Sequence, residues 1–163
     1  MANYKVIDNF LPAESFVKLK DLFYSNNFPW FYYPNISFNS QSKNNLFYLV
    51  HIFYFNSMIN SDFFDDIKIL LDKINPNKLL RVKANMYPNQ GIKDLDEMHT
   101  DYDYSHKGAI FSINTCNGGT ILENGTRIPS LANRILFFDP GKPHDSYNCT
   151  DAKNRVNINI NYL

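Results

Sequence analysis

The amino-acid sequence predicts a mainly β protein: a jelly-roll-like core of short strands with supporting helices packed on one outer face. Three observations lead to this fold class. Two amphipathic stretches come early in the chain, and from residue 79 onward short β-rich runs alternate with turn signals. Aromatic residues, which are enriched in strands, make up 16% of the chain. Early helices followed by many short strands favour a sandwich or barrel with helical support.

The N-terminal part alternates helical and extended patterns. A short strand is expected at Tyr4–Asp8, followed by an amphipathic helix over residues 12–25, an aromatic loop at Phe28–Tyr33, a buried strand at Leu46–Phe55 and a second helix from a Ser61 cap to the Asn75-Pro76 stop.

Residues 79–163 should form the β core. Its expected strands are LLRVKANMY, KGAIFSIN, TILEN, NRILFFD, HDSY and NRVNINI, each bounded by a turn. In the last strand side chains alternate, with Val156, Ile158 and Ile160 on one face and Arg155, Asn157, Asn159 and Asn161 on the other. The polar face fits either a solvent-exposed sandwich or a barrel that holds a polar ligand.

Length and charge limit the function classes. The 163 residues fit one domain, in which 1–78 supply helical support and the first strands. Sixteen basic and sixteen acidic residues cancel, which argues against a nucleic-acid binder that works through phosphate contacts. We expect no membrane segment, ordinary thiols at Cys116 and Cys149, and a cytoplasmic protein. No pattern assigns an oligomeric state.

Three residues form a candidate metal site. His99 and Asp101 make a His-x-Asp triplet, and His144 follows the PGKP turn. Two imidazoles and one carboxylate are the facial triad typical of non-haem Fe(II) oxygenases, whereas zinc prefers a closed tetrahedron or one open position. Arg155, on the polar face of the last strand, is suited to binding a carboxylate through two hydrogen bonds. The implied co-substrate is a dicarboxylate.

This order of residues resembles the Fe(II)- and 2-oxoglutarate-dependent oxygenases, which fold as a cupin-like double-stranded β-helix. The segments RVKANMYP, IFSIN, NGGT, NRILFFDPGKPH and RVNINI look like the prolyl-4-hydroxylase-like branch. The whole is similar to small oxygenases encoded by phages and marine bacteria, which would place it in a host cytoplasm if phage-encoded. The resemblance covers residues 80–162 well, and the N-terminal half only as helical support.

The resemblance implies a role for each residue of the site. His99, Asp101 and His144 would bind Fe(II), and Arg155 and Tyr87 would hold 2-oxoglutarate, although Tyr87 also fits simple packing. Dioxygen would convert the co-substrate to succinate and carbon dioxide while an unactivated C–H bond is hydroxylated, with no catalytic residue beyond the metal centre. The candidate pocket-lining residues are Ser112, Asn114, Asn157 and Asn159. Ser112 stands where many prolyl hydroxylases have tyrosine.

Several alternatives stay open at this stage. The substrate is a peptidyl proline, or else a free amino acid or small metabolite. The non-enzyme alternative is a non-catalytic jelly-roll binding module, and a zinc hydrolase could use the same ligands. We interpret His51 as a hydrogen-bonded core residue, His106 as solvent-exposed, and the acidic run Asp94, Asp96 and Glu97 as a solvated face. Residues 28–33 and 88–97 are candidate lips of the site.

Overall fold

The computed structural model describes residues 4–34, 46–91 and 98–163. Along the chain its elements are β1 (Lys5–Ile7), α1 (Ala13–Phe23), β2 (Phe31–Tyr33), β3 (Tyr48–Phe55), β4 (Met58–Ile59), the 3₁₀ helix η1 (Asp65–Ile67), α2 (Lys68–Ile74), β5 (Leu79–Pro88), β6 (Lys107–Ser112), β7 (Gly119–Leu122), β8 (Arg127–Pro129), β9 (Arg134–Phe138), β10 (His144–Tyr147) and β11 (Asn154–Tyr162). Neither described α-helix has the length and apolar character needed to cross a membrane.

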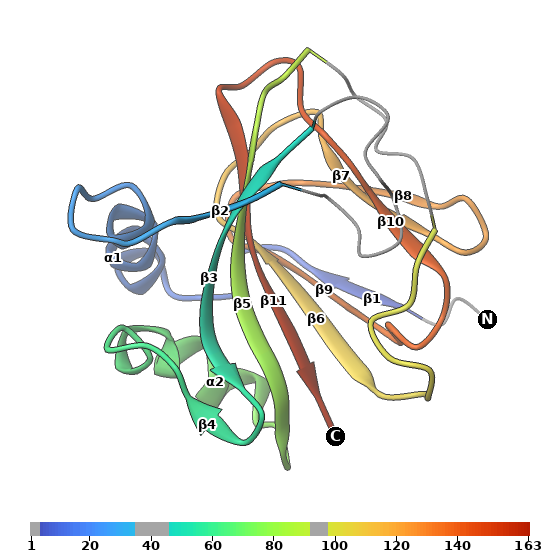
Figure 1. Cartoon of the computed structure of the whole chain (residues 1–163), viewed down its shortest axis with the longest axis horizontal. Coiled ribbons are helices and arrows are strands. Elements are labelled where there is room, and N and C mark those ends of the chain that lie inside the picture. Colours follow the sequence, from blue (N-terminus) through green and yellow to red (C-terminus); the bar gives the residue numbers. More distant parts are fainter. Residues whose placement is uncertain (1–3, 35–45, 92–97) are drawn as a thin grey trace.

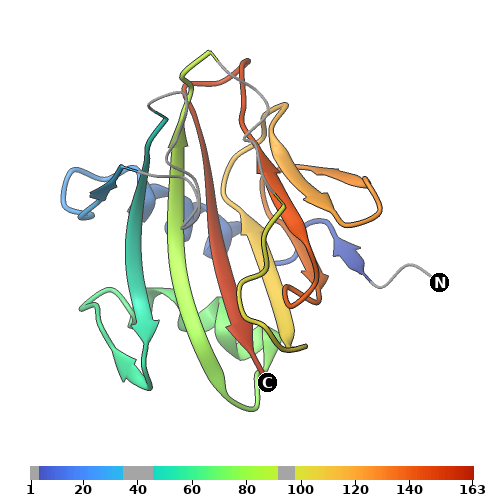
Figure 2. The same cartoon turned by 45° about the vertical axis from the view of Figure 1, so that its right-hand side comes forward.

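Two antiparallel sheets form the β core. The larger has eight strands in the order β1-β9-β6-β11-β5-β3-β2, with β4 paired to β3 at one end. The smaller has three strands in the order β10-β7-β8. Figures 1 and 2 show both helices on one face of the large sheet and the small sheet on the other. The predicted mainly β fold with helices on one outer face is confirmed.

The alternation in β11 separates the two sides of the large sheet. Val156, Ile158 and Ile160 are fully buried in the main hydrophobic core with residues of α1 and α2. On the opposite face Arg155 and Asn157 are also buried, with 2% and 3% of their surface exposed. This polar face is therefore not the solvent face of an ordinary sandwich, and the barrel with a polar interior is the correct alternative.

The N-terminal elements differ in detail from the expected ones. The aromatic segment contains an edge strand, β2, because Phe31 pairs with Val50 of β3. The second helix begins later than predicted: the Ser61 hydroxyl accepts the Phe63 N–H at 3.0 Å, and η1 precedes α2. Asn75 ends α2 with a left-handed φ of 53°, as the predicted stop requires.

Asn133 attaches the segment before α1 to the start of β9. It is buried and adopts φ 63°, and its side chain both accepts from the Leu11 N–H and donates to the Leu11 carbonyl at 2.8 Å. We expect Asn133→Ala to lower the free energy of unfolding by about 2–4 kcal/mol, because two buried backbone groups lose their partners and alanine adopts a left-handed φ less readily than asparagine.

The exposed Asn56 is the matched control for that substitution, because it shares a positive φ of 52°. Asn56→Ala should cost about 1 kcal/mol in backbone strain alone. Urea unfolding of both variants measures the difference, and equal losses would show that the Leu11 hydrogen bonds contribute nothing.

Candidate metal centre

His99, Asp101 and His144 lie together. One potential ligand atom from each of the three residues lies within 4.8 Å of the others. The two histidines are 45 positions apart in the sequence, but their backbones form a bridge with two N–H···O bonds of 2.9 Å. The Asp101 N–H donates to the Pro140 carbonyl at 2.9 Å. Backbone pairing against the segment that contains His144 thus places all three side chains at one point.

The tautomer of His144 suits metal binding. Its Nδ1 lies 3.0 Å from the Lys142 carbonyl oxygen, so Nδ1 carries the hydrogen and Nε2 presents its lone pair. Burial lowers the pKa of His144, although the nearby Asp101 carboxylate opposes this shift. The imidazole is therefore neutral and able to act as a ligand at neutral pH.

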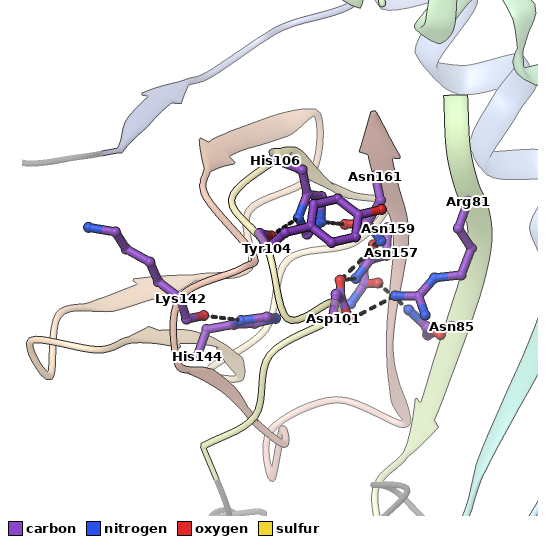
Figure 3. A network of polar contacts seen from close by, with 10 residues as sticks. All are labelled: Arg81, Asn85, Asp101, Tyr104, His106, Lys142, His144, Asn157, Asn159 and Asn161. Carbon is purple, nitrogen blue, oxygen red and sulfur yellow. Dashed lines mark hydrogen bonds and ion pairs between the residues drawn. The ribbon is translucent and has the colours of Figure 1, made fainter. Parts of the chain in front are cut away.

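Asp101 is held as a carboxylate by groups of β5 and β11. Its Oδ1 lies 2.7 Å from Arg81 Nη2, and Oδ2 accepts from Asn161 Nδ2 at 3.0 Å and from Asn159 Nδ2 at 3.5 Å. Burial acts to raise the pKa of Asp101, but the Arg81 guanidinium and other neighbouring charges outweigh it and hold the pKa well below its usual range. Figure 3 shows the carboxylate between Arg81 and the asparagines.

His106 belongs to the same hydrogen-bond network, and the expectation that it is solvent-exposed was wrong. It is 6% exposed. Its Nε2 lies 3.0 Å from Asn161 Oδ1 and its Nδ1 2.9 Å from the Tyr104 carbonyl oxygen. His106 therefore orients the amide that donates to Asp101 (Figure 3).

His51 is a hydrogen-bonded core residue, as interpreted from the sequence. It is 4% exposed, and its ring nitrogens lie 2.8 Å from the Pro29 carbonyl oxygen and 2.7 Å from Ser61 Oγ. The acidic run at Asp94, Asp96 and Glu97 lies outside the described residues.

Arg155 is a buried cation with neutral partners. Its Nη1 donates to the carbonyls of Gly119 and, at 2.7 Å, Tyr147, and its Nη2 donates to Ser146 Oγ at 3.2 Å. Its Cζ lies 4.7 Å from the centre of the Tyr87 ring. Within the described ranges no carboxylate forms an ion pair with it. Because an uncompensated buried charge is costly, this site is suited to an anionic ligand.

The metal triad and Arg155 share one pocket. Its lining residues are Tyr48, Lys83, Asn85, Tyr87, His99, Asp101, Ile110, Thr120, His144, Asp145, Ser146, Arg155, Asn157 and Asn159. The arrangement therefore offers three clustered candidate metal ligands and a guanidinium on the wall of one polar pocket. These groups fit a metal ion together with a carboxylate ligand.

The four candidate lining residues have different positions. Asn157 and Asn159 line the pocket, whereas Ser112 lines a smaller adjoining pocket that also borders Arg155. Asn114 lies outside both pockets. Its amide donates to the Asn154 carbonyl and accepts from the Val156 N–H, both at 2.8 Å, and so fastens the chain after β6 to β11.

Of the polar face of β5, only Tyr87 was predicted from the sequence, and Arg81, Lys83 and Asn85 were missed. Arg81, Lys83, Asn85 and Tyr87 alternate with Val82, Ala84 and Met86, and the polar set pairs across the sheet with Asn161, Asn159, Asn157 and Arg155 of β11. The same period-two pattern that revealed the polar face of β11 is present in RVKANMY. It could have identified these residues before the structure did.

Comparisons with known proteins identify the fold. No protein-family profile and no curated protein sequence matches the chain. Among solved structures, it is similar to a prolyl hydroxylase from Trichoplax adhaerens in complex with a peptide of the hypoxia-inducible factor oxygen degradation domain, with 15% identity, 98% of this chain and 83% of that chain covered, and a TM-score of 0.68.

Two further structures have the same fold. The viral collagen prolyl hydroxylase of Paramecium bursaria Chlorella virus-1, in its 2-oxoglutarate complex, has 12% identity, coverage of 99% and 97%, and a TM-score of 0.60. The α-ketoglutarate-dependent epimerase SnoN from nogalamycin biosynthesis has 13% identity, coverage of 99% and 77%, and a TM-score of 0.62. The chain therefore has the double-stranded β-helix fold of the Fe(II)- and 2-oxoglutarate-dependent oxygenases, and its His-x-Asp and distal His residues meet at one point of that fold.

Proposed function

We propose that this protein is an Fe(II)- and 2-oxoglutarate-dependent dioxygenase that hydroxylates an unactivated C–H bond. The observation that supports this most directly is the shared pocket. It combines two imidazoles and a carboxylate within 4.8 Å of one another with a buried guanidinium that makes no ion pair in the described part of the chain. A facial triad leaves coordination positions open, and a buried cation needs an anion.

Each side chain has a distinct task in this proposal. His99, Asp101 and His144 hold Fe(II), and Arg155 pairs with the distal carboxylate of 2-oxoglutarate. Tyr87, whose ring packs on the Arg155 guanidinium, helps to hold the co-substrate. When bound, the iron supplies the activation of dioxygen, with 2-oxoglutarate leaving as succinate and carbon dioxide. The chain orients these groups and limits the access of water to them.

The similar structures support two different substrate classes. The similar structures from Trichoplax adhaerens and the Chlorella virus are prolyl hydroxylases, which agrees with the sequence-based proposal of a peptidyl proline. SnoN, named as an epimerase of nogalamycin biosynthesis, has the same fold and agrees with a small-molecule substrate. Likeness to phage and marine-bacterial oxygenases stays a prediction.

An anaerobic titration followed by oxygen tests the proposed function. Fe(II) and 2-oxoglutarate added to apo-protein should produce the weak visible band of an iron chelate, and admitting air should then yield succinate. His99→Ala, checked for folding by circular dichroism, should show neither. A folded wild-type protein without band or succinate contradicts the proposal. Activity that requires neither oxygen nor 2-oxoglutarate would instead identify a zinc hydrolase, and no metal binding would support a binding module.

A further inference from the structure

The pocket contains a second cation besides Arg155. Lys83 lies in the middle of β5 opposite Asn159 of β11 and lines the same pocket as the metal triad. Its Nζ lies 5.8 Å from the centre of the Tyr48 ring, and no carboxylate in residues 4–34, 46–91 or 98–163 forms an ion pair with it. Burial and, to a lesser extent, repulsion from Arg81 lower the pKa of Lys83 to about 8. Its ammonium form therefore predominates at pH 7.

Asn85, the next pocket residue along β5, has a buried acceptor without a partner. The side chain is 2% exposed, and its Nδ2 donates to Asn157 Oδ1 at 3.0 Å. Its Oδ1 accepts no hydrogen bond from the described residues. Such an orphaned acceptor is costly unless a ligand donates to it. 2-Oxoglutarate has no N–H or O–H group at neutral pH, so the co-substrate does not satisfy Asn85.

The charged groups of the pocket also favour a substrate that has a free carboxylate. In the proposed holoenzyme the two positive charges of iron balance the two negative charges of 2-oxoglutarate, and Arg81 balances Asp101 through their 2.7 Å ion pair. Among the described residues, Asp145 is the one further carboxylate that lines the pocket beside Arg155 and Lys83. Because Arg155 is assigned to 2-oxoglutarate, Lys83 is left without a carboxylate partner among the described residues. A free α-carboxylate would supply that partner, whereas a peptidyl proline would not, because its carboxyl group is part of a peptide bond.

We propose that the primary substrate is a small carboxylic acid of the amino-acid class. Lys83 pairs with its carboxylate, and a neighbouring N–H group of the substrate donates to Asn85 Oδ1. This inference rests on the proposed function and selects the small-molecule alternative over the peptide.

The test uses the Fe(II)-loaded protein with 2-oxoglutarate and a panel of matched probes. The panel is the twenty free L-amino acids, each beside its α-amide, together with a blocked proline-containing peptide. We expect at least one free acid to stimulate succinate formation at least tenfold more than its amide does. Anaerobic calorimetric titration of that acid into the loaded protein should show binding, which is measured independently of turnover.

Substitutions of Lys83 separate recognition of the substrate from recognition of the co-substrate. Lys83→Met should weaken calorimetric binding of the stimulating acid at least tenfold, while the 2-oxoglutarate concentration that half-saturates the chelate band changes less than twofold. Lys83→Arg keeps the charge and should retain most of the binding. Thermal unfolding of both variants checks that the fold is intact.

Three outcomes overturn the inference. In the first, the amides or the peptide stimulate succinate formation as well as the acids do, and in the second, no acid in the panel stimulates it. In the third, Lys83→Met weakens 2-oxoglutarate binding tenfold, which assigns Lys83 to the co-substrate. Failure of the proposed function is distinguishable, because the wild-type protein would then show no chelate band before any probe is added.

Discussion

We expect Asp101→Asn to abolish the iron chelate band and 2-oxoglutarate-dependent succinate formation. The substitution keeps the side-chain shape but removes the negative charge that two neutral imidazoles cannot replace. Loss of an orienting neighbour alone typically costs 10- to 100-fold in metal affinity, so loss of a ligand should cost about 100-fold or more. Calorimetric titration of apo-protein with Fe(II) under argon measures the change.

The Asp101 substitution needs a stability control, because the same carboxylate compensates the charge of Arg81 at 2.7 Å. Removing one partner of a largely buried ion pair destabilises the fold, so the melting temperature of Asp101→Asn should fall. The double variant Arg81→Gln/Asp101→Asn removes both charges and should recover part of that stability without recovering iron binding. A single variant that binds Fe(II) as tightly as wild type would remove Asp101 from the metal centre.

Arg155→Lys should raise the concentration of 2-oxoglutarate needed for half-saturation by about 30-fold or more, and Arg155→Met should raise it further. Truncating one partner of a buried, hydrogen-bonded charge pair typically costs about 2–5 kcal/mol, and each 1.4 kcal/mol is about tenfold. Lysine keeps the charge but not the planar pair of donors that binds a carboxylate. Titration of the chelate band with 2-oxoglutarate gives the ratio directly.

Fe(II) binding in the absence of co-substrate is the control for Arg155. It should change little in either variant, because Arg155 contacts Gly119, Tyr147, Ser146 and the Tyr87 ring rather than the triad. Equal loss of Fe(II) and 2-oxoglutarate binding would indicate general damage to the fold. Unchanged 2-oxoglutarate binding in Arg155→Met would exclude Arg155 as the co-substrate residue.

The residues of the pocket could be predicted from the sequence where they alternate within one strand. Alternation in β11 placed Arg155, Asn157 and Asn159 on one face, and the structure confirms that face as the polar interior. His106 was misjudged because its position in a turn-rich segment resembles an exposed loop, whereas its ring bonds to Asn161, 55 positions away. Asn114 continues the IFSIN run, but β6 ends at Ser112 and the amide bonds to the backbone instead.

The sequence by itself determined the alternating faces of the strands, because backbone geometry imposes a period of two within each strand. It also supplied the candidate metal ligands, because their residue types match a facial triad. Only the tertiary structure decided that His99 pairs with His144, that Arg81 neutralises Asp101, and that Lys83 and Asn85 share the pocket with them. Those contacts depend on which strands become neighbours and in what register. Neighbour choice reflects burial summed over the whole sheet, which no single segment encodes.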